Sequence, residues 1–250
     1  MIPADLSLKG KVVMVAGNGF QAVSLLSSYL AEAGADLVIT CEDKDALKEA
    51  EEKIKPTGQK VLPFNCSAAD TLAVNRVVDE AVASMGKIDV LINSFNHEFA
   101  RPFFEISEKE WRGIIDYNLT STYIFTSAAG RHMLRQKEGS IVSLASGLAE
   151  RGLSNCAAYC ASQGGIVQFS RALALELARE NIRVNAIEVG WIESSAQSGK
   201  SNESLAHYIP LRRLGKADDI GGLLVYLASP ASSYITGQAY RIDGGIMAHG

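Results

Sequence analysis

Short runs of apolar, largely β-branched residues alternate along this chain with longer amphipathic segments. The run Val12-Val13-Met14-Val15-Ala16 is typical of a buried strand. The segment from Ala22 to Ala33, closed by Gly34, has the apolar spacing of the helix that would follow it. Because such strands are apolar along their whole length, the pattern predicts a sheet that is covered by helices on both faces.

The same alternation continues to the end of the chain and predicts about seven strands. Buried strands that are joined by helices of this length favour a parallel sheet with right-handed crossovers. The fold class is therefore α/β, a single-domain, doubly wound sheet of the Rossmann type that spans residues 1–250. Further strands are expected at 37–40, 61–65, 90–93, 140–144, 183–187 and 238–242, and further helices at 44–55 and 71–85.

Composition and charge narrow the possible partners. With 250 residues, 47% of them hydrophobic, the chain can bury one sizeable core. A net charge of −4 without a basic stripe argues against a nucleic-acid partner. No apolar run approaches the roughly 18 residues of a membrane span, and no signal segment is evident, so a cytoplasmic location is expected. Cys156 and Cys160 lack further ligands, so no metal site is expected.

Several motifs carry a resemblance to a known family. They are Gly86-Lys87-Ile88-Asp89-Val90-Leu91-Ile92-Asn93, Ile182-Arg183-Val184-Asn185-Ala186-Ile187 and, near the end, Ile242-Asp243-Gly244-Gly245. Over nearly its whole length the chain resembles the short-chain dehydrogenases/reductases. These are Rossmann-type enzymes that transfer a hydride between a nicotinamide nucleotide and an alcohol or ketone.

The resemblance places four residues of the reaction centre. Asn118 stands where the family anchors a water, and Ser146, 13 residues before Tyr159, matches the serine that binds the substrate oxygen. Tyr159 matches the general acid/base, but Gln163 replaces the family's lysine. A free tyrosine has a pKa of about 10, and a neutral glutamine supplies no charge to lower it. Tyr159 is therefore expected to stay protonated, and none of the four remnant positions is expected to be catalytically functional.

The positions that would hold the nucleotide are altered as well. The first loop keeps Gly17, but Gln21 and Val23 replace its two later glycines, and their side chains are expected to crowd the phosphate site. Phe95 is expected to lie against the cofactor path. These departures predict that the cofactor site is lost and that this chain binds no cofactor. The remaining remnant or altered positions are Cys41, Ser67, Asn93, Val189 and Gly190.

One alternative leaves the nucleotide site intact. The segment Gly17-Asn18-Gly19-Phe20-Gln21-Ala22 also fits the glycine-x-glycine-x-x-alanine fingerprint, with Glu42 about twenty residues further on. If a nucleotide binds, the charge of Glu42 would disfavour the extra phosphate of NADP, so NAD is the better fit.

These observations lead to three hypotheses. The first is a catalytically impaired subunit that pairs with an active short-chain dehydrogenase, or with itself, through about 218–228 and 238–242. The hydroxyaryl-succinyl-CoA dehydrogenase of anaerobic toluene breakdown has an inactive subunit that looks similar. The second is an active NAD(P)-dependent oxidoreductase for an alcohol or ketone with Gln163 in the lysine position. The third is a ligand-binding or sensor protein that uses His97 and Glu98. In each case residues 194–208 would form a lid loop.

Overall fold

The computed structural model describes residues 4–193 and 200–248. Its seven strands form one sheet in the order β3-β2-β1-β4-β5-β6-β7, and every neighbouring pair is parallel. This confirms the predicted doubly wound sheet. The strands are β1 Val12–Ala16, β2 Asp36–Cys41, β3 Val61–Asn65, β4 Val90–Asn93, β5 Gly139–Ser146, β6 Ile182–Val189 and β7 Ala239–Ile242.

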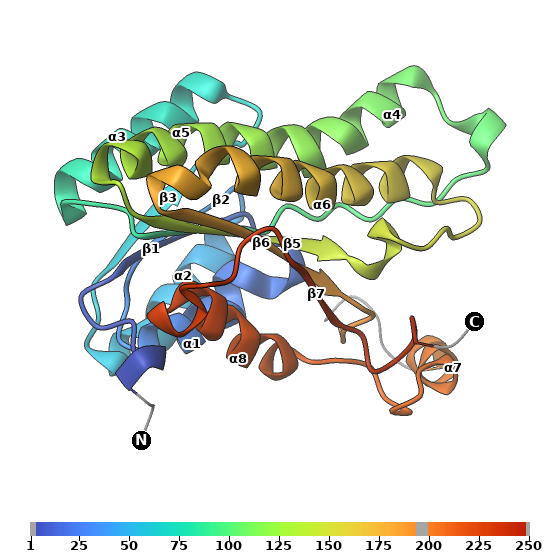
Figure 1. Cartoon of the computed structure of the whole chain (residues 1–250). Helices are drawn as coiled ribbons and strands as arrows, with labels where there is room; N and C mark the ends of the chain where they lie inside the picture. Colours follow the sequence, from blue (N-terminus) through green and yellow to red (C-terminus); the bar gives the residue numbers. More distant parts are fainter. Residues whose placement is uncertain (1–3, 194–199, 249–250) are drawn as a thin grey trace.

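Helices cover both faces of the sheet (Figure 1). α3 to α6 lie over one face, and α1, α2 and α8 lie over the other. α7 stands apart, beyond the carboxyl ends of the strands. The helices are α1 Ser27–Glu32, α2 Lys44–Ile54, α3 Thr71–Met85, α4 Glu108–Ile115, α5 Ser121–Gln136, α6 Ala157–Leu177, α7 Lys200–Tyr208 and α8 Ala217–Ala228. None of the helices in these described ranges is both long enough and apolar enough to cross a bilayer.

The core consists of one apolar layer on each face of the sheet. In β2, Leu37 and Ile39 belong to the layer beneath α1 and α2, whereas Val38, between them, belongs to the layer beneath α3 and α5. All three side chains are fully buried. This two-sided burial explains why the strands read as continuous apolar runs.

Local signals in the sequence set the ends of several helices. The Asp43 side chain accepts hydrogen bonds from Asp45 N and Ala46 N at the start of α2, and Asp70 does the same for Leu72 N and Ala73 N at the start of α3. Gly86 ends α3 in the left-handed conformation, with φ of 85°. α3 therefore has the predicted bounds.

The first helix differs from its prediction. The segment Ala22–Leu26, labelled η3, is π-helical, and α1 begins only at Ser27. A π-helical turn inside a longer helix often marks a functional site. Here it follows directly on the loop after β1. The strand order reverses between β1 and β4, so the loops that follow these strands border the crevice where this fold class binds ligands.

Candidate active site

A cleft of about 680 Å³ opens at the carboxyl edge of the sheet. The loops after β1, β4, β5 and β6 form its walls, together with the first turn of α6 and part of α7. Tyr159 and Ser146, which the sequence singled out, both line this cleft. The structure therefore brings together the predicted acid/base tyrosine and the predicted substrate-binding serine.

Two elements hold these side chains in place. Ser146 is the last residue of β5, which is paired with β6 without a break from Gly139↔Ile182 to Ser146↔Val189. Tyr159 lies in the first turn of α6, and Gln163 follows it four residues later on the same helix face. A rigid strand end and a rigid helix thus fix both hydroxyl groups.

The Gln163 amide is part of a neutral hydrogen-bond network. Its Oε1 accepts from the backbone N–H of Ser146 at 2.8 Å, and its Nε2 donates to Asn96 Oδ1 at 3.4 Å. The hydroxyl of Tyr159 donates to the same Asn96 oxygen at 2.7 Å. Gln163 is fully buried. It therefore links the end of β5 to the loop after β4, and it brings no charge to Tyr159.

The surroundings of Tyr159 keep its phenol protonated. Burial raises the pKa of Tyr159 well above its usual value, and the negative charge of Glu98 raises it further. Hydrogen bonding by Ser146 and by Asn96 lowers the pKa and offsets only part of this effect. At neutral pH Tyr159 is therefore present as the phenol, a weak acid, and almost none of it is the phenolate base.

Asn118 lies behind the cleft and fixes the loop that carries Asn96. Its Oδ1 accepts from His97 N at 2.7 Å, and its Nδ2 donates to His97 O at 3.2 Å and to Ser162 Oγ at 2.9 Å. Asn118 itself sits in a π-helical turn, η6 Asp116–Thr120, just before α5. It thus acts on the site by positioning residues 96–98.

The loop after β1 packs closely against the loop after β4. A Cβ at Gly17 would come within 2.6 Å of Ser94 O, and one at Gly19 would come within 2.6 Å of the Asn96 Cβ. The two glycines are therefore needed for contact between the loops. The N–H groups of Val23 and Ser24, in the first turn of the π-helix, are capped by Asn18 Oδ1 at 3.1 and 3.2 Å.

Of the two residues that replace glycines, only Gln21 reaches the cleft. It has a left-handed φ of 57°, and its Nε2 donates to the carbonyl of Glu193, in the segment after β6, at 3.1 Å. Val23 is fully buried in the core. The prediction that its side chain crowds the phosphate site is therefore wrong.

Phe95 lies beside Gly17 in the loop after β1, as predicted, but its ring is buried and does not face the cleft. Its ring is buried against Phe125, with centroids 5.4 Å apart, and against Tyr117, with centroids 6.2 Å apart. It does not belong to the residues that line the cleft. The ring turns into the core because aromatic side chains from α5 and from the turn before it provide an apolar surface there.

The other predicted nucleotide positions are spread along the sheet edge. Only Gly190 lines the cleft, where its N–H donates to Ile242 O at 2.8 Å. Cys41 and Val189 are buried, and Ser67 is exposed and accepts a hydrogen bond from Ala69 N. Asn93 is fully buried, donates to Thr126 Oγ1 at 2.9 Å, and leaves its own Oδ1 without a partner among the described residues.

These contacts test how well a nicotinamide nucleotide would fit. The cleft offers open space beside Tyr159, Ser146 and Gly190, which suits the nicotinamide end. The diphosphate end is more restricted, because Asn18 caps the helix N–H groups and the Gln21 side chain is held by its hydrogen bond to the Glu193 carbonyl. The residues present thus fit the reactive half of the nucleotide, and the Gln21 side chain must turn aside to admit the other half.

Some residues of the site were not identified as functional from the sequence. Asn96 accepts the Tyr159 hydroxyl, and Trp191 and Cys156 line the cleft. In the short-chain dehydrogenases the turn after the fourth strand reads asparagine-asparagine-alanine-glycine, whereas this chain has Asn93-Ser94-Phe95-Asn96. The replacement of that glycine by Asn96 was the available signal. Glu98 does line the cleft, whereas the His97 ring packs on Tyr117 with centroids 5.7 Å apart.

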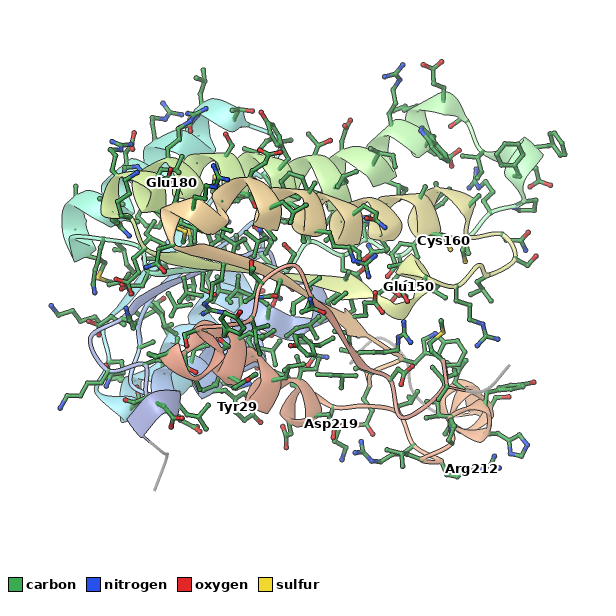
Figure 2. All side chains as sticks on the ribbon, viewed as in Figure 1. Tyr29, Glu150, Cys160, Glu180, Arg212 and Asp219 are labelled. Atoms are coloured by element: carbon green, nitrogen blue, oxygen red, sulfur yellow. The ribbon has the colours of Figure 1, made fainter. Side chains whose placement is uncertain are left out.

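A buried charge lies beside the site. Glu188 in β6 is 1% exposed and accepts from Arg241 Nε on β7 at 3.1 Å, while its Oε1 has no partner among the described residues. Burial raises the pKa of Glu188, and the arginine offsets part of that rise. Arg241 also pairs with Glu150, which follows β5 at the same edge of the sheet (Figure 2).

The predicted lid falls partly outside the described residues. Residues 194–199 lie in the gap between the described ranges. Residues 200–208 form helix α7 rather than a loop, and Leu205 from this helix lines the cleft. α7 therefore forms part of the outer wall.

Comparison with known proteins shows that the chain is similar to proteins named as dehydrogenases and reductases. A family profile described as enoyl-(acyl carrier protein) reductase matches residues 25–247. The 2-dehydro-3-deoxy-D-gluconate 5-dehydrogenase of Bacillus subtilis is 34% identical, over 96% of this chain and 95% of the relative. The 3-oxoacyl-(acyl-carrier-protein) reductase FabG of Thermotoga maritima is 31% identical, over 97% of this chain and 100% of the relative.

A solved structure gives the same picture. The gluconate 5-dehydrogenase of Burkholderia cenocepacia, in complex with NADP and tartrate, has a TM-score of 0.91 and 25% identity, and the match covers 98% of each chain.

These matches correct the first hypothesis from the sequence. The expectation of a catalytically impaired subunit is wrong, because the relatives that match nearly the whole chain are named as dehydrogenases and reductases. They also give no support to a link with the toluene-degradation complex. The alternative of an active oxidoreductase agrees better with the findings.

Proposed function

Because the chain belongs to the short-chain dehydrogenase/reductase family, we propose that it is a nicotinamide-dependent oxidoreductase that acts chiefly as a carbonyl reductase. The observation that carries the proposal is the shared cleft of Tyr159 and Ser146, with the Tyr159 phenol held in its protonated form. A protonated phenol beside a substrate site suits proton donation to a reduced carbonyl oxygen.

The chain's own residues supply the proton and hold the substrate. The Ser146 hydroxyl accepts from Leu148 N at 3.2 Å, so its own proton is available to a substrate carbonyl oxygen. Tyr159 donates its proton to the oxygen as the C–O double bond becomes single, and solvent then returns a proton to Tyr159. Asn96 and Gln163 orient the phenol before this transfer.

The nucleotide, when bound, supplies a hydride to the carbonyl carbon. Asn18, Gly19, Gln21, Gly190 and Ile192 are the residues that would border it in the cleft. The sequence-based expectation of no cofactor depended on the hypothesis of an impaired subunit and is not kept. NAD remains preferred to NADP, because the carboxylate of Glu42 follows β2 directly and would repel a ribose phosphate.

The raised pKa of Tyr159 gives reduction and oxidation different pH profiles. Reduction needs the protonated phenol, which is present throughout the neutral range, so its rate should be nearly constant from pH 6 to about pH 9. Oxidation of an alcohol needs the phenolate. Its rate should therefore rise about tenfold for each pH unit, without a plateau below about pH 10.

The test is steady-state oxidation of NADH by a series of ketones over this pH range. Tyr159→Phe should lower kcat at least about a hundredfold with little change in KM. Tyr123→Phe is the matched control, because Tyr123 is exposed on α5 and lies outside the cleft. Equal loss in both variants, or full activity in Tyr159→Phe, would refute the role given to Tyr159.

Association of two copies is a further part of this proposal. β7 is the last strand of the sheet, and α8 lies beside β5 and β6 with Leu223, Val225 and Tyr226 only partly buried. An edge strand and a helix face of this kind suit a symmetric contact through 218–228 and 238–242. Light scattering of the purified chain would measure the mass in solution, and a monomer at micromolar concentration would contradict it.

A further inference from the structure

Apolar side chains make up part of the cleft wall. They include Leu148 and Leu153 after β5, Trp191 after β6, and Leu205 and Leu214 near α7. Leu153 is 47% exposed, so an apolar surface is left open to a ligand at the mouth. Walls of this kind bury the carbon skeleton of a substrate and give it no hydrogen bonds.

One carboxylate interrupts this apolar lining. Glu98 is the only charged side chain among the described residues that line the cleft. It is exposed and makes no ion pair with any residue in the described ranges. Its charge acts inside the cleft, since it raises the pKa of both Tyr159 and Cys156. A substrate seated against Tyr159 would therefore lie in the field of an unpaired negative charge.

We propose that the cleft selects an apolar carbonyl compound or alcohol that is neutral or cationic, and that Glu98 discriminates against carboxylates. The inference rests on the proposed function, because it names the substrate class of the same site. Anionic substrates such as sugar acids would meet a negative charge and, among the described lining residues, no cation to pair with. A cationic group on the substrate would gain the attraction that an anion loses.

Binding can be measured apart from turnover through Trp191. The chain has two tryptophans, and Trp111 lies on α4 outside the cleft, so Trp111→Phe leaves Trp191 as the only tryptophan reporter. Three ligands of nearly equal size are suitable probes: 4-acetylbenzoate, its methyl ester, and 4-acetyl-N,N,N-trimethylanilinium. They carry a negative charge, no charge and a positive charge, and quenching of Trp191 emission gives a Kd for each.

The expected order of affinity is cation, then ester, then anion. For a charge at an exposed position we expect each step to be about threefold at low ionic strength, decreasing when salt is raised to about 0.5 M. Glu98→Gln should remove most of both steps. Glu105→Gln is the matched control, because Glu105 is exposed beyond the cleft and its replacement changes the net charge equally.

The outcomes separate this inference from the proposed function. An anion that binds as tightly as the ester, an order of affinity that survives Glu98→Gln, or a failure of all three probes to bind overturns the inference. The same ligands are then offered as ketone substrates with NADH. Binding in the expected order without turnover of any probe refutes the proposed function alone, whereas preferred turnover of the anion refutes the substrate class alone.

Discussion

Replacement of Gln163 by lysine would restore the charge that the site lacks. The two hydrogen bonds to Asn96 Oδ1, 3.4 Å from Gln163 Nε2 and 2.7 Å from the Tyr159 hydroxyl, bring the amide nitrogen within about 6 Å of the phenol oxygen. At an effective dielectric constant near 20, a unit charge at about 6 Å stabilises the phenolate by about 3 kcal/mol. This lowers the pKa of Tyr159 by about two units.

The measurement is the pH dependence of alcohol oxidation in Gln163→Lys, with NAD at saturation. The oxidation rate at pH 9 should rise between about tenfold and a hundredfold, and the whole pH profile should shift by about two units toward lower pH. Gln163→Met is the matched control, because it also loses the bond to Ser146 N but adds no charge. If the lysine and methionine variants have the same pH profile, the charge argument fails.

Two other substitutions test the strain and the charge around the cleft. Gln21→Gly and Gln21→Ala both remove the hydrogen bond to Glu193, but only glycine adopts the left-handed φ of 57° without strain. In urea denaturation the free energy of unfolding of Gln21→Gly should therefore exceed that of Gln21→Ala by about 1 kcal/mol. Equal stabilities would contradict this. Arg241→Met should lower the free energy of unfolding at pH 8 by about 3 kcal/mol, because it leaves the Glu188 carboxylate buried without a partner. Because burial raises the folded-state pKa of Glu188, the cost is present above that pKa and shrinks as the pH falls below it. A loss that is independent of pH would refute this reasoning. So would an equal loss in Arg171→Met, since the ion pair of Arg171 among the described residues is with the exposed Glu150.

The sequence predicts the fold well because strands that are buried on both faces appear in it as continuous apolar runs. β3, β4 and α3 have their predicted bounds, since each ends at a polar residue or a glycine. β5 and β6 extend beyond their predictions to Ser146 and Val189. Glu188 explains why the extension of β6 was not predicted, because a charged residue argues against a buried strand. Its burial is made possible by Arg241 on β7, which is far away in the sequence.

The site was predicted less completely because side-chain direction depends on distant neighbours. The resemblance to the short-chain dehydrogenases placed Ser146 and Tyr159 in one site, and both line the cleft. The direction of the Phe95 ring depends on Phe125 and Tyr117, which the local sequence around Phe95 does not reveal. Val23 belongs to the core for the same reason, since its neighbours lie on other elements.

The substitutions in the reaction centre depend on one another. The hypothesis of a catalytically impaired subunit was wrong because it treated each substitution as a separate loss. Asn96 replaces a glycine and introduces an amide oxygen that needs donors. The Tyr159 hydroxyl and the Gln163 amide nitrogen both donate to this oxygen, so Gln163 provides a hydrogen bond that Asn96 requires. A lysine at position 163 would lie against the loop after β4, which Asn118 already holds in place through its hydrogen bonds to His97. The neutral network orients the Tyr159 phenol without adding a positive charge, and burial keeps the phenol protonated, which is the state that reduction requires.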